Sequence, residues 1–264
     1  MLILLPPSEG KAAPTRGARL DLAALTMPGL TDARAEVIDA LRTLCQGDPV
    51  RASAALGVPA SQPELVELNA HLRERATARA DRIYTGVLYD ALDAASLSSA
   101  AKRRLTRRVR VASSVFGLVS PADRIPAYRL SGDTRLPGLG MAQGERVSSY
   151  WRRHLGPAAE EALGEGLLID LRSGTYAAFW KPDAALGGRV ATVRVLHETD
   201  GRRSVVSHFN KATKGRITRA LLEDGATPRT PTELADALRD LGWYVEAGAP
   251  GRAGTQLDVV VAEL

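Results

Sequence analysis

The residues best suited to chemistry are cations at a predicted junction between a strand and a helix. The segment 207–216 reads SHFNKATKGR, and Lys211, Lys214 and Arg216 are expected in about the first turn of a helix over 211–223. Positive charge opposes the helix dipole at that end, where free backbone N–H groups already attract anions. Three cations placed there predict a bound anion, although a solvated basic turn would have the same pattern.

Three further groups of residues suggest the same chemistry. Lys11 follows a predicted strand over 2–5 in the turn PPSEGK, which lacks the spacing of a P-loop. Ser173 and Tyr176 lie in LRSGTY, directly after a predicted strand over 167–171, where loops of α/β proteins commonly bind ligands. The run KRRLTRRVR is typical of phosphate contact, or equally of a solvated surface. Its six cations are Lys102, Arg103, Arg104, Arg107, Arg108 and Arg110.

The sequence contains no motif typical of a metal site or a cofactor site. The single cysteine, Cys45, excludes an internal disulfide and a cysteine-based metal cluster. The four histidines share no metal-ligand spacing, and neither a nucleophile elbow nor a Rossmann fingerprint occurs. We therefore expect no cofactor and no metal, and the residues alone leave open whether the protein is an enzyme.

Overall charge favours an anionic partner. The formal net charge is +5 and the isoelectric point is about 9.6. Only five of the 35 basic residues are lysines, and such an arginine excess is also typical of GC-rich genomes, so the lysines are the more informative cations. The first apolar run ends at Leu5, too short for a signal peptide or a membrane span. We predict a cytoplasmic protein without a membrane partner, and favour a monomer.

The elements that must position these residues follow from periodicity and turn signals. Helices are expected over 32–45, 63–80, 87–93, 146–163, 211–223 and from Pro231 to Gly242. Strands are expected over 2–5, 167–171, 189–197, 203–208, 243–247 and 257–263. The segment 98–112 fits a helix or a strand, and 132–144 is expected to be a glycine-rich loop. This order predicts one α/β (α+β-like) domain over 1–264, with a mixed sheet flanked by helices.

Six motifs occur in an order that resembles the YaaA peroxide-stress family. They are LILLPPSEGK, IYTGVLYDAL, SSVFGLVSPADRIPAYRL, SYW, LIDLRSGTY and SHFNKATKG. The resemblance covers most of the chain, and it implies a compact α/β domain of unusual topology with a positively charged cleft. The positions that match the family's cleft residues are Lys11, Tyr84, Tyr128, Arg129, Ser173, Tyr176, Lys211 and Lys214.

The resemblance also implies protection against hydrogen peroxide, by limiting iron-driven damage to DNA, and binding of duplex DNA through a helix-hairpin-helix element. This sequence departs from the family pattern in three places. The opening turn PPSEGK is longer than the usual form, and Thr175 stands where the family usually has Glu. The predicted hairpin, between the helices expected over 63–80 and 87–93, contains only Gly86.

Two functions remain open from the sequence. A DNA-binding protective protein explains the basic charge and the arginine run, and it predicts binding that weakens steeply with salt. An enzyme acting on a small phosphorylated or carboxylated substrate in the same cleft explains why Tyr, Ser and Lys converge on loops at strand ends. Direct iron storage is disfavoured, because clustered carboxylates or His/Glu pairs are missing from the pattern.

Overall fold

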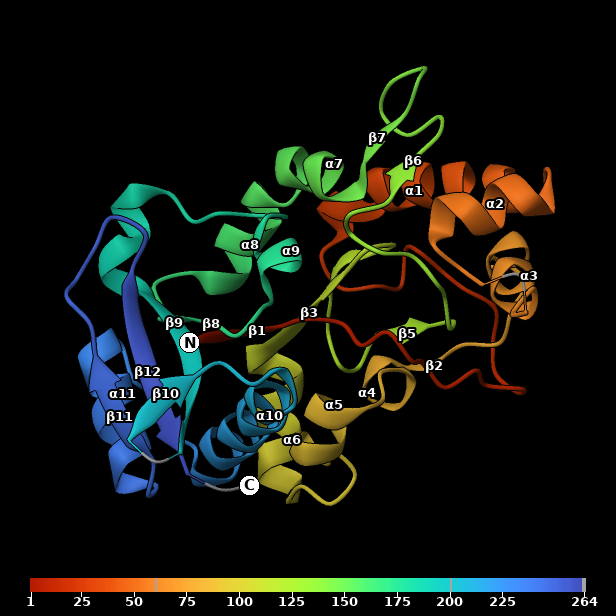
Figure 1. Cartoon of the computed structure of the whole chain (residues 1–264). Helices are drawn as coiled ribbons and strands as arrows, with labels where there is room; N and C mark the ends of the chain where they lie inside the picture. Colours follow the sequence, from red (N-terminus) through yellow and green to blue (C-terminus); the bar gives the residue numbers. More distant parts are fainter. Residues whose placement is uncertain (60, 200, 263–264) are drawn as a thin grey trace.

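The computed structural model describes residues 1–59, 61–199 and 201–262, and within them eight strands pair into one mixed sheet (Figure 1). In spatial order the strands are β11 (Tyr244–Ala247), β12 (Thr255–Val261), β9 (Val190–Thr199), β8 (Leu168–Asp170), β1 (Leu2–Leu5), β3 (Val109–Ser113) and β4 (Gly117–Val119), with β10 (Arg202–Ser204) paired to β9. The run from β12 to β3 is parallel, whereas β11, β10 and β4 are antiparallel to their neighbours. The predicted mixed sheet is confirmed.

Strand β1 lies near the middle of the sheet, although it opens the chain. Ile3 is opposite Val109 on β3 and Ile169 on β8, and the side chains of residues 2–5 are at most 1% exposed. A continuous apolar run is what a parallel strand covered on both faces requires. The first residues of the chain therefore form the centre of the core.

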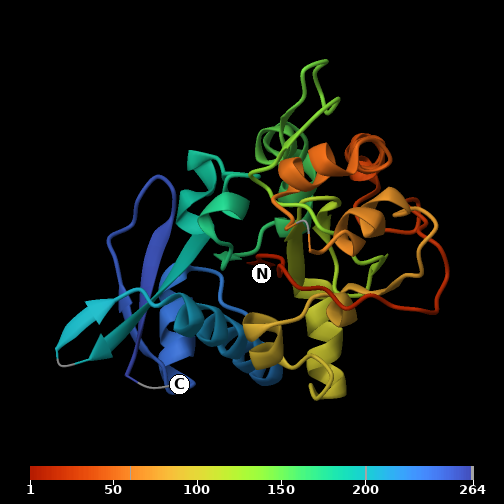
Figure 2. The ribbon, with the colours of Figure 1, turned by 45° about the vertical axis from the view of Figure 1, so that its right-hand side comes forward.

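Helices cover the central strands on both sides (Figures 1 and 2). On one side lie α10 (Ser207–Asp224) and α6 (Ser99–Arg108), and α10 also packs closely against α5 (Val87–Leu92). On the other side lie α7 (Val147–His154), α8 (Gly156–Leu163) and α9 (Gly174–Ala177). The helix α11 (Pro231–Asp240) packs against β11, and the 3₁₀ helix η2 (Ala184–Arg189) precedes β9. None of the helices in the described chain is long and apolar enough to cross a bilayer.

A helical lobe flanks the β4 edge of the sheet. It contains η1 (Pro28–Leu30), α1 (Thr31–Cys45), α2 (Pro49–Leu56) and α3 (Glu64–Ala70). Two short ribbons pair β2 (Ala78–Arg79) with β5 (Arg124–Ile125), and β6 (Arg135–Leu136) with β7 (Glu145–Arg146). The one-turn helix α4 (Ala80–Ile83) leads from β2 towards α5.

Several predicted elements are confirmed with small shifts in their bounds. The helices expected over 32–45, 87–93 and 231–242 correspond to α1, α5 and α11, and Thr230 caps α11 by accepting a hydrogen bond from the Glu233 N–H (3.2 Å). The strands expected over 2–5, 167–171 and 243–247 are also present. The strand expected over 257–263 is β12, and its predicted residue 263 lies outside the described residues, as does residue 200 in the predicted hairpin turn.

The helix expected over 63–80 is wrong beyond Ala70. Thr77 instead donates through both its backbone N–H (2.9 Å) and its hydroxyl (2.8 Å) to the carbonyl of Ala18. Ala78 then pairs with Ile125 in the β2–β5 ribbon. These partners lie far away in the sequence, so the helical spacing of apolar residues within 63–80 could not predict the contacts.

Two other corrections have local causes. The helix expected over 146–163 is two helices that meet at Leu155, because Pro157 lacks the N–H that a continuous helix needs. The ambiguous segment 98–112 contains both alternatives in succession, with α6 ending at Arg108 and β3 beginning at Val109. The expected loop over 132–144 is mostly irregular but includes β6.

The start of α10 is earlier than predicted, and this changes the setting of its cations. The strand expected over 203–208 ends at Ser204, and α10 begins at Ser207. The N–H of Asn210 already bonds to the carbonyl of Val206 (2.9 Å). Lys211, Lys214 and Arg216 therefore lie in the second and third turns, and the prediction that they surround the free N–H groups of the first turn is wrong.

Candidate functional site

Three loops leave the sheet at one edge, because the strands that precede them are parallel neighbours. Strand β1 leads into PPSEGK, β8 leads into LRSGTY, and β3 leads into Ser114. The carboxyl ends of parallel strands share an edge, which is where open α/β sheets usually bind ligands. This arrangement brings the loops that carry Lys11, Ser173 and Tyr176 to the same edge of the sheet.

A buried chain of hydroxyl groups lies under this edge. The hydroxyls of Tyr84 and Tyr128 are 3.0 Å apart, and the Tyr128 hydroxyl is 2.8 Å from Ser113 Oγ, which accepts from the Phe116 N–H (3.1 Å). Burial raises the pKa of both phenols, so they stay protonated at neutral pH. The chain fixes both rings against β3. Ser113 was missed by sequence reasoning, although it lies in a quoted motif.

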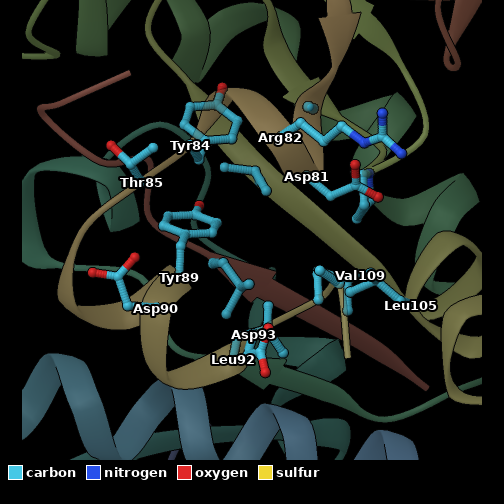
Figure 3. Close-up of a pocket in the computed structure, with 16 residues that line it drawn as sticks. Asp81, Arg82, Tyr84, Thr85, Tyr89, Asp90, Leu92, Asp93, Leu105 and Val109 are labelled. Carbon is cyan, nitrogen blue, oxygen red and sulfur yellow. The ribbon is translucent and has the colours of Figure 1, made fainter. Parts of the chain in front are cut away.

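The PPSEGK turn is anchored to the connection between α4 and α5. Tyr89 donates to the carbonyl of Pro6 (2.7 Å), and its ring stacks on Tyr84 with 5.3 Å between centroids. Ser8 Oγ accepts from the Thr85 N–H (3.1 Å), while Lys11 forms a β-bridge with Tyr84. Figure 3 shows the ring of Tyr84 above that of Tyr89. Both residues line a pocket with a volume of about 310 Å³.

Lys11 lies with its amine over the face of Tyr128. The Nζ atom is 4.2 Å from the centre of that ring and donates to the carbonyl of Ser8 (2.7 Å). Burial, and to a smaller extent the charge of Arg129, lowers the pKa of the Lys11 amine to about 7, while Glu9 opposes the shift. Near neutral pH, a substantial share of this amine therefore carries no charge.

The expected single cleft is divided in two by the PPSEGK turn, since Glu9 and Gly10 line both parts. The first part, the Lys11 cleft, has a volume of about 600 Å³ and is lined by Lys11, Tyr128 and Arg129 among others. The second, the Lys214 cleft, has a volume of about 560 Å³ and contains four predicted residues. These are Ser173, Tyr176, Lys211 and Lys214.

Arg216 does not join either cleft. It is exposed and lies two residues beyond Lys214, which rotates it by about 200° around the helix. Lys211 is exposed at the cleft, whereas Lys214 is only 8% exposed. Burial lowers the pKa of the Lys214 amine, and the charge of Asp170 opposes that change.

The carboxylate whose charge raises the pKa of Lys214 is already paired. Asp170 accepts two hydrogen bonds from the guanidinium group of Arg172, at 2.8 Å from Nε and 2.7 Å from Nη2, and both side chains are almost completely buried. Arg172 also donates to the carbonyls of Tyr176 (3.2 Å) and Trp180 (2.9 Å), so it shapes the loop that carries Ser173. Sequence reasoning missed this pair, although the motif LIDLRSGTY contains both residues.

Thr175 has a carboxylate beside it. Its hydroxyl donates to Asp133 Oδ2 (2.9 Å), and both residues line the Lys214 cleft. Asp133 belongs to the glycine-rich loop and therefore places an acid next to the position where the resemblance leads one to expect Glu. Only the three-dimensional structure brings these two residues together.

A second missed residue holds Arg129 in place. Asn69 is fully buried, accepts from the Arg129 N–H (2.9 Å) and donates to the Arg129 carbonyl (2.7 Å). Arg129 Nη1 is 4.0 Å from Glu9 Oε2, across the mouth of the Lys11 cleft. A single Asn at the end of a short helix gave no signal in the sequence.

The basic run 102–110 has two faces with different environments. Arg104 donates to the carbonyls of Leu222 (2.8 Å) and Glu223 (3.2 Å), and Arg108 donates to that of Ala226 (2.9 Å). Both stabilise the carboxyl end of α10, where the helix dipole favours cations. Arg110 also bonds to nearby backbone carbonyls.

The other face of α6 lines a shallow groove of about 740 Å³. We call it the basic groove, and its cations are Arg79, Arg82, Lys102, Arg103 and Arg107. Asp81 is the acid in its lining, and Arg79 pairs with it at 2.6 Å. Lys102 donates to the carbonyl of Ala95 (2.6 Å), and no ion pair within the described chain uses the other three cations.

The expected helix-hairpin-helix lacks its first helix, because α3 ends at Ala70. The structure has the one-turn helix α4 and the helix α5 in its place, joined by residues 84–86 with Gly86 at φ 90°. That positive φ is readily adopted by glycine. The described residues contain no group of three or more His, Cys, Asp or Glu side chains that could hold a metal ion.

Comparison with known proteins identifies the chain's relatives. A family profile described as "Peroxide stress protein YaaA" matches residues 1–248. A UPF0246 protein of Streptomyces coelicolor is 51% identical over 266 residues, covering 100% of both chains. UPF0246 proteins of Corynebacterium efficiens and Corynebacterium glutamicum strain R are 43% and 38% identical, each covering 93% of this chain and 95% of the relative.

Proposed function

Because the chain belongs to the peroxide stress protein YaaA family, we propose that it protects DNA during peroxide stress by binding the duplex and limiting iron-mediated damage. The observation that carries the DNA-binding part is the basic groove. Its five cations face one carboxylate, Asp81, which is already paired with Arg79. The other four cations have no ion-pair partner among the described residues, and clustered cations of this kind favour phosphate contact.

The groove replaces the Lys211–Lys214 region as the preferred DNA surface. Arg82, Arg103 and Arg107 are exposed, so their guanidinium groups can reach a broad backbone. Lys214 is buried at the bottom of a cleft, where it is poorly placed to contact a duplex. Arginine also binds phosphate oxygens through two parallel N–H groups, which strengthens and orients each contact.

The test is binding of a labelled duplex at about 50 mM and about 200 mM salt. We expect affinity to fall steeply with salt for the wild type. In Arg103→Ala/Arg107→Ala, the slope of log K against log salt should decrease by about 2. Arg51→Ala/Arg252→Ala is the matched control, because both arginines are exposed and lie outside the clefts and the groove.

Two outcomes would count against the groove. A slope that decreases only in Lys211→Ala/Lys214→Ala would return the DNA surface to the Lys214 cleft. Affinity that does not change with salt in the wild type would contradict phosphate binding altogether. The protective role is then measured separately, as strand breaks in plasmid DNA exposed to ferrous iron and hydrogen peroxide with and without the protein.

A second function is favoured by the Lys214 cleft, where the protein would act as an enzyme on a small phosphorylated or carboxylated substrate. Lys214 is buried there while the oxygens of Asp170 are engaged by Arg172, and Asn210 Oδ1 is buried without a hydrogen-bond partner among the described residues. An anion that carries a hydroxyl group would give the Lys214 amine a counter-charge and the Asn210 oxygen a hydrogen-bond donor. Thermal stabilisation by phosphorylated or carboxylated compounds, lost in Lys214→Ala, would support this function.

A further inference from the structure

Lys11 is a cleft-lining amine without a carboxylate partner. Its Nζ donates to the backbone carbonyls of Ser8 (2.7 Å) and Glu9 (3.4 Å), and no ion pair in the described chain includes it. Glu9 is the acid whose charge raises the pKa of this amine. Its side chain is 89% exposed, however, and its carboxylate lies 4.0 Å from Arg129. Lysines that serve only as surface charge are usually solvated, whereas this one is held in a fixed place.

The surroundings of the amine favour its uncharged form. Tyr128 and Tyr84 lie 4.2 Å and 5.8 Å from Nζ, measured to the ring centres, and Arg129 adds positive charge nearby. The charged or titratable groups that face the amine are Glu9 on its own turn, Tyr84 beside it, and Tyr128 and Arg129 across from it. An amine lone pair that is free at neutral pH is a nucleophile.

The Lys11 cleft also offers a place for an anionic group. Arg129 and Arg75 line the cleft together with Lys11, and Arg75 Nε is buried without a hydrogen-bond partner among the described residues. The acids in the lining, Glu9 and Glu64, are both exposed. A carboxylate or phosphate held by the two arginines would lie beside the amine, within a volume of about 600 Å³.

We propose that Lys11 is a nucleophilic amine that condenses with the carbonyl group of an anionic aldehyde or ketone held by Arg129 and Arg75. The Nζ lone pair attacks the carbonyl carbon, and the C=O π electrons move to oxygen. A proton passes from nitrogen to that oxygen to give a carbinolamine. The hydroxyl group then takes up a proton from solvent, and the C–O bond breaks with loss of water to leave a protonated imine. No oxidant or reductant is consumed, and hydrolysis reverses the reaction.

Two sources share the required chemistry. One is a small aldehyde or keto compound that carries a phosphate or carboxylate. The other is the ring-opened sugar of an abasic site in DNA, which is an aldehyde flanked by phosphates. The inference does not depend on the basic groove, because salt-dependent DNA binding there and imine formation at Lys11 are measured separately.

The test uses wild-type protein, two probes and borohydride. One arm contains pyridoxal 5′-phosphate and the other a duplex with a single abasic site, and sodium borohydride converts any imine into a stable secondary amine. Peptide mass spectrometry then compares the labelling rate of Lys11 with those of the exposed Lys102 and Lys181. We expect Lys11 to react at least about tenfold faster near neutral pH in one arm or both, since a neutral amine reacts and an ammonium does not.

Two variants test the roles of the amine and of the anion-binding arginine. Lys11→Arg keeps the charge but should abolish the fast labelling, and Arg129→Gln should slow pyridoxal 5′-phosphate more than pyridoxal, which lacks the phosphate. Fast labelling by the small probe alone assigns a small-molecule substrate, and fast labelling by the duplex alone assigns the abasic site. Labelling of Lys11 no faster than that of Lys102 in both arms would overturn the proposal. This comparison is made within the wild-type protein, so it does not depend on whether a variant folds.

Discussion

Arg34 is a fully buried residue whose guanidinium group joins the helical lobe to the β4 edge of the sheet. It donates to the carbonyls of Phe116 (3.0 Å), Leu118 (2.9 Å) and Thr26 (2.8 Å). Burial lowers its pKa to about 10, so it remains charged at neutral pH. Its guanidinium group therefore links backbone carbonyls of β4 and the residues beside it to the segment before η1.

We therefore expect Arg34→Leu to lower the free energy of unfolding by about 3–5 kcal/mol, because three backbone acceptors lose their donor at once. Urea unfolding followed by circular dichroism measures this change. Arg51→Leu on the exposed side of α2 is the control and should change stability by no more than about 0.5 kcal/mol. Equal stability of the two variants would show that Arg34 is not a structural connection.

At this scale, the sequence predicted residues whose chemical type alone indicates a role. It did not predict residues whose role depends on a hydrogen-bond partner elsewhere in the chain. Lys11 was predicted for the site, and the structure brings it against Tyr84 and Tyr128. Asn69 and Asp133 were not identified, because a lone amide or acid is informative only when its partner is known. Both partners are distant in the sequence, at Arg129 and Thr175.

At the scale of elements, Gly215 allows α10 and α5 to pack in direct backbone contact. A Cβ at this position would lie 2.2 Å from the carbonyl oxygen of Leu88 and 2.9 Å from Ala91 Cβ, both on α5. These distances are too short for any side chain. The helices α10 and α5 are adjacent in Figure 1, and α5 carries Tyr89, which anchors the PPSEGK turn.

Gly215→Ala should therefore force the two helices apart and destabilise the protein by about 1–3 kcal/mol. Gly174→Ala is the matched control, because it also lies in a helix but has nothing within 4 Å of an added Cβ. That variant should be neutral or slightly stabilising, since Ala favours helix more than Gly does. Thermal unfolding of both variants measures the difference, and a Gly215→Ala variant as stable as the control would contradict close packing.

Elements with a complete local signal were predicted well. Helix α11 has its cap at Thr230 and Pro231 at its start, and strand β1 is a short apolar run ended by two prolines. Elements that depend on distant partners were not. The segment after Ala70 has helical spacing, but Thr77 bonds to Ala18, and that contact decides its conformation.

At the scale of the whole molecule, much of the positive charge is used for structure. Arg104 and Arg108 stabilise the end of α10, Arg34 and Arg172 bond buried carbonyls, and only part of the excess remains on the surface. The sequence predicted an anion-binding protein from its net charge but could not separate these roles. The difference depends on which side of each helix faces the core, and for α6 that division creates the basic groove.

Two partly or fully buried amines give the whole protein a characteristic dependence of stability on pH. The pKa of Lys11 is lowered to about 7 and that of Lys214 is also lowered, both chiefly by burial. Between about pH 7 and pH 9 the unfolded chain therefore binds more protons than the folded one, and stability rises with pH. Each group adds at most about 1.4 kcal/mol per pH unit.

We expect the free energy of unfolding, measured with urea at about pH 7, 8 and 9, to increase across this window. Lys11→Met should remove part of the increase, because its side chain does not titrate and fits an aromatic environment. Lys102→Met, at an exposed position, should keep the full slope. A Lys11→Met slope equal to that of the wild type would mean that the Lys11 amine stays charged in the folded protein, and it would also remove the chemical basis for imine formation in the Lys11 cleft.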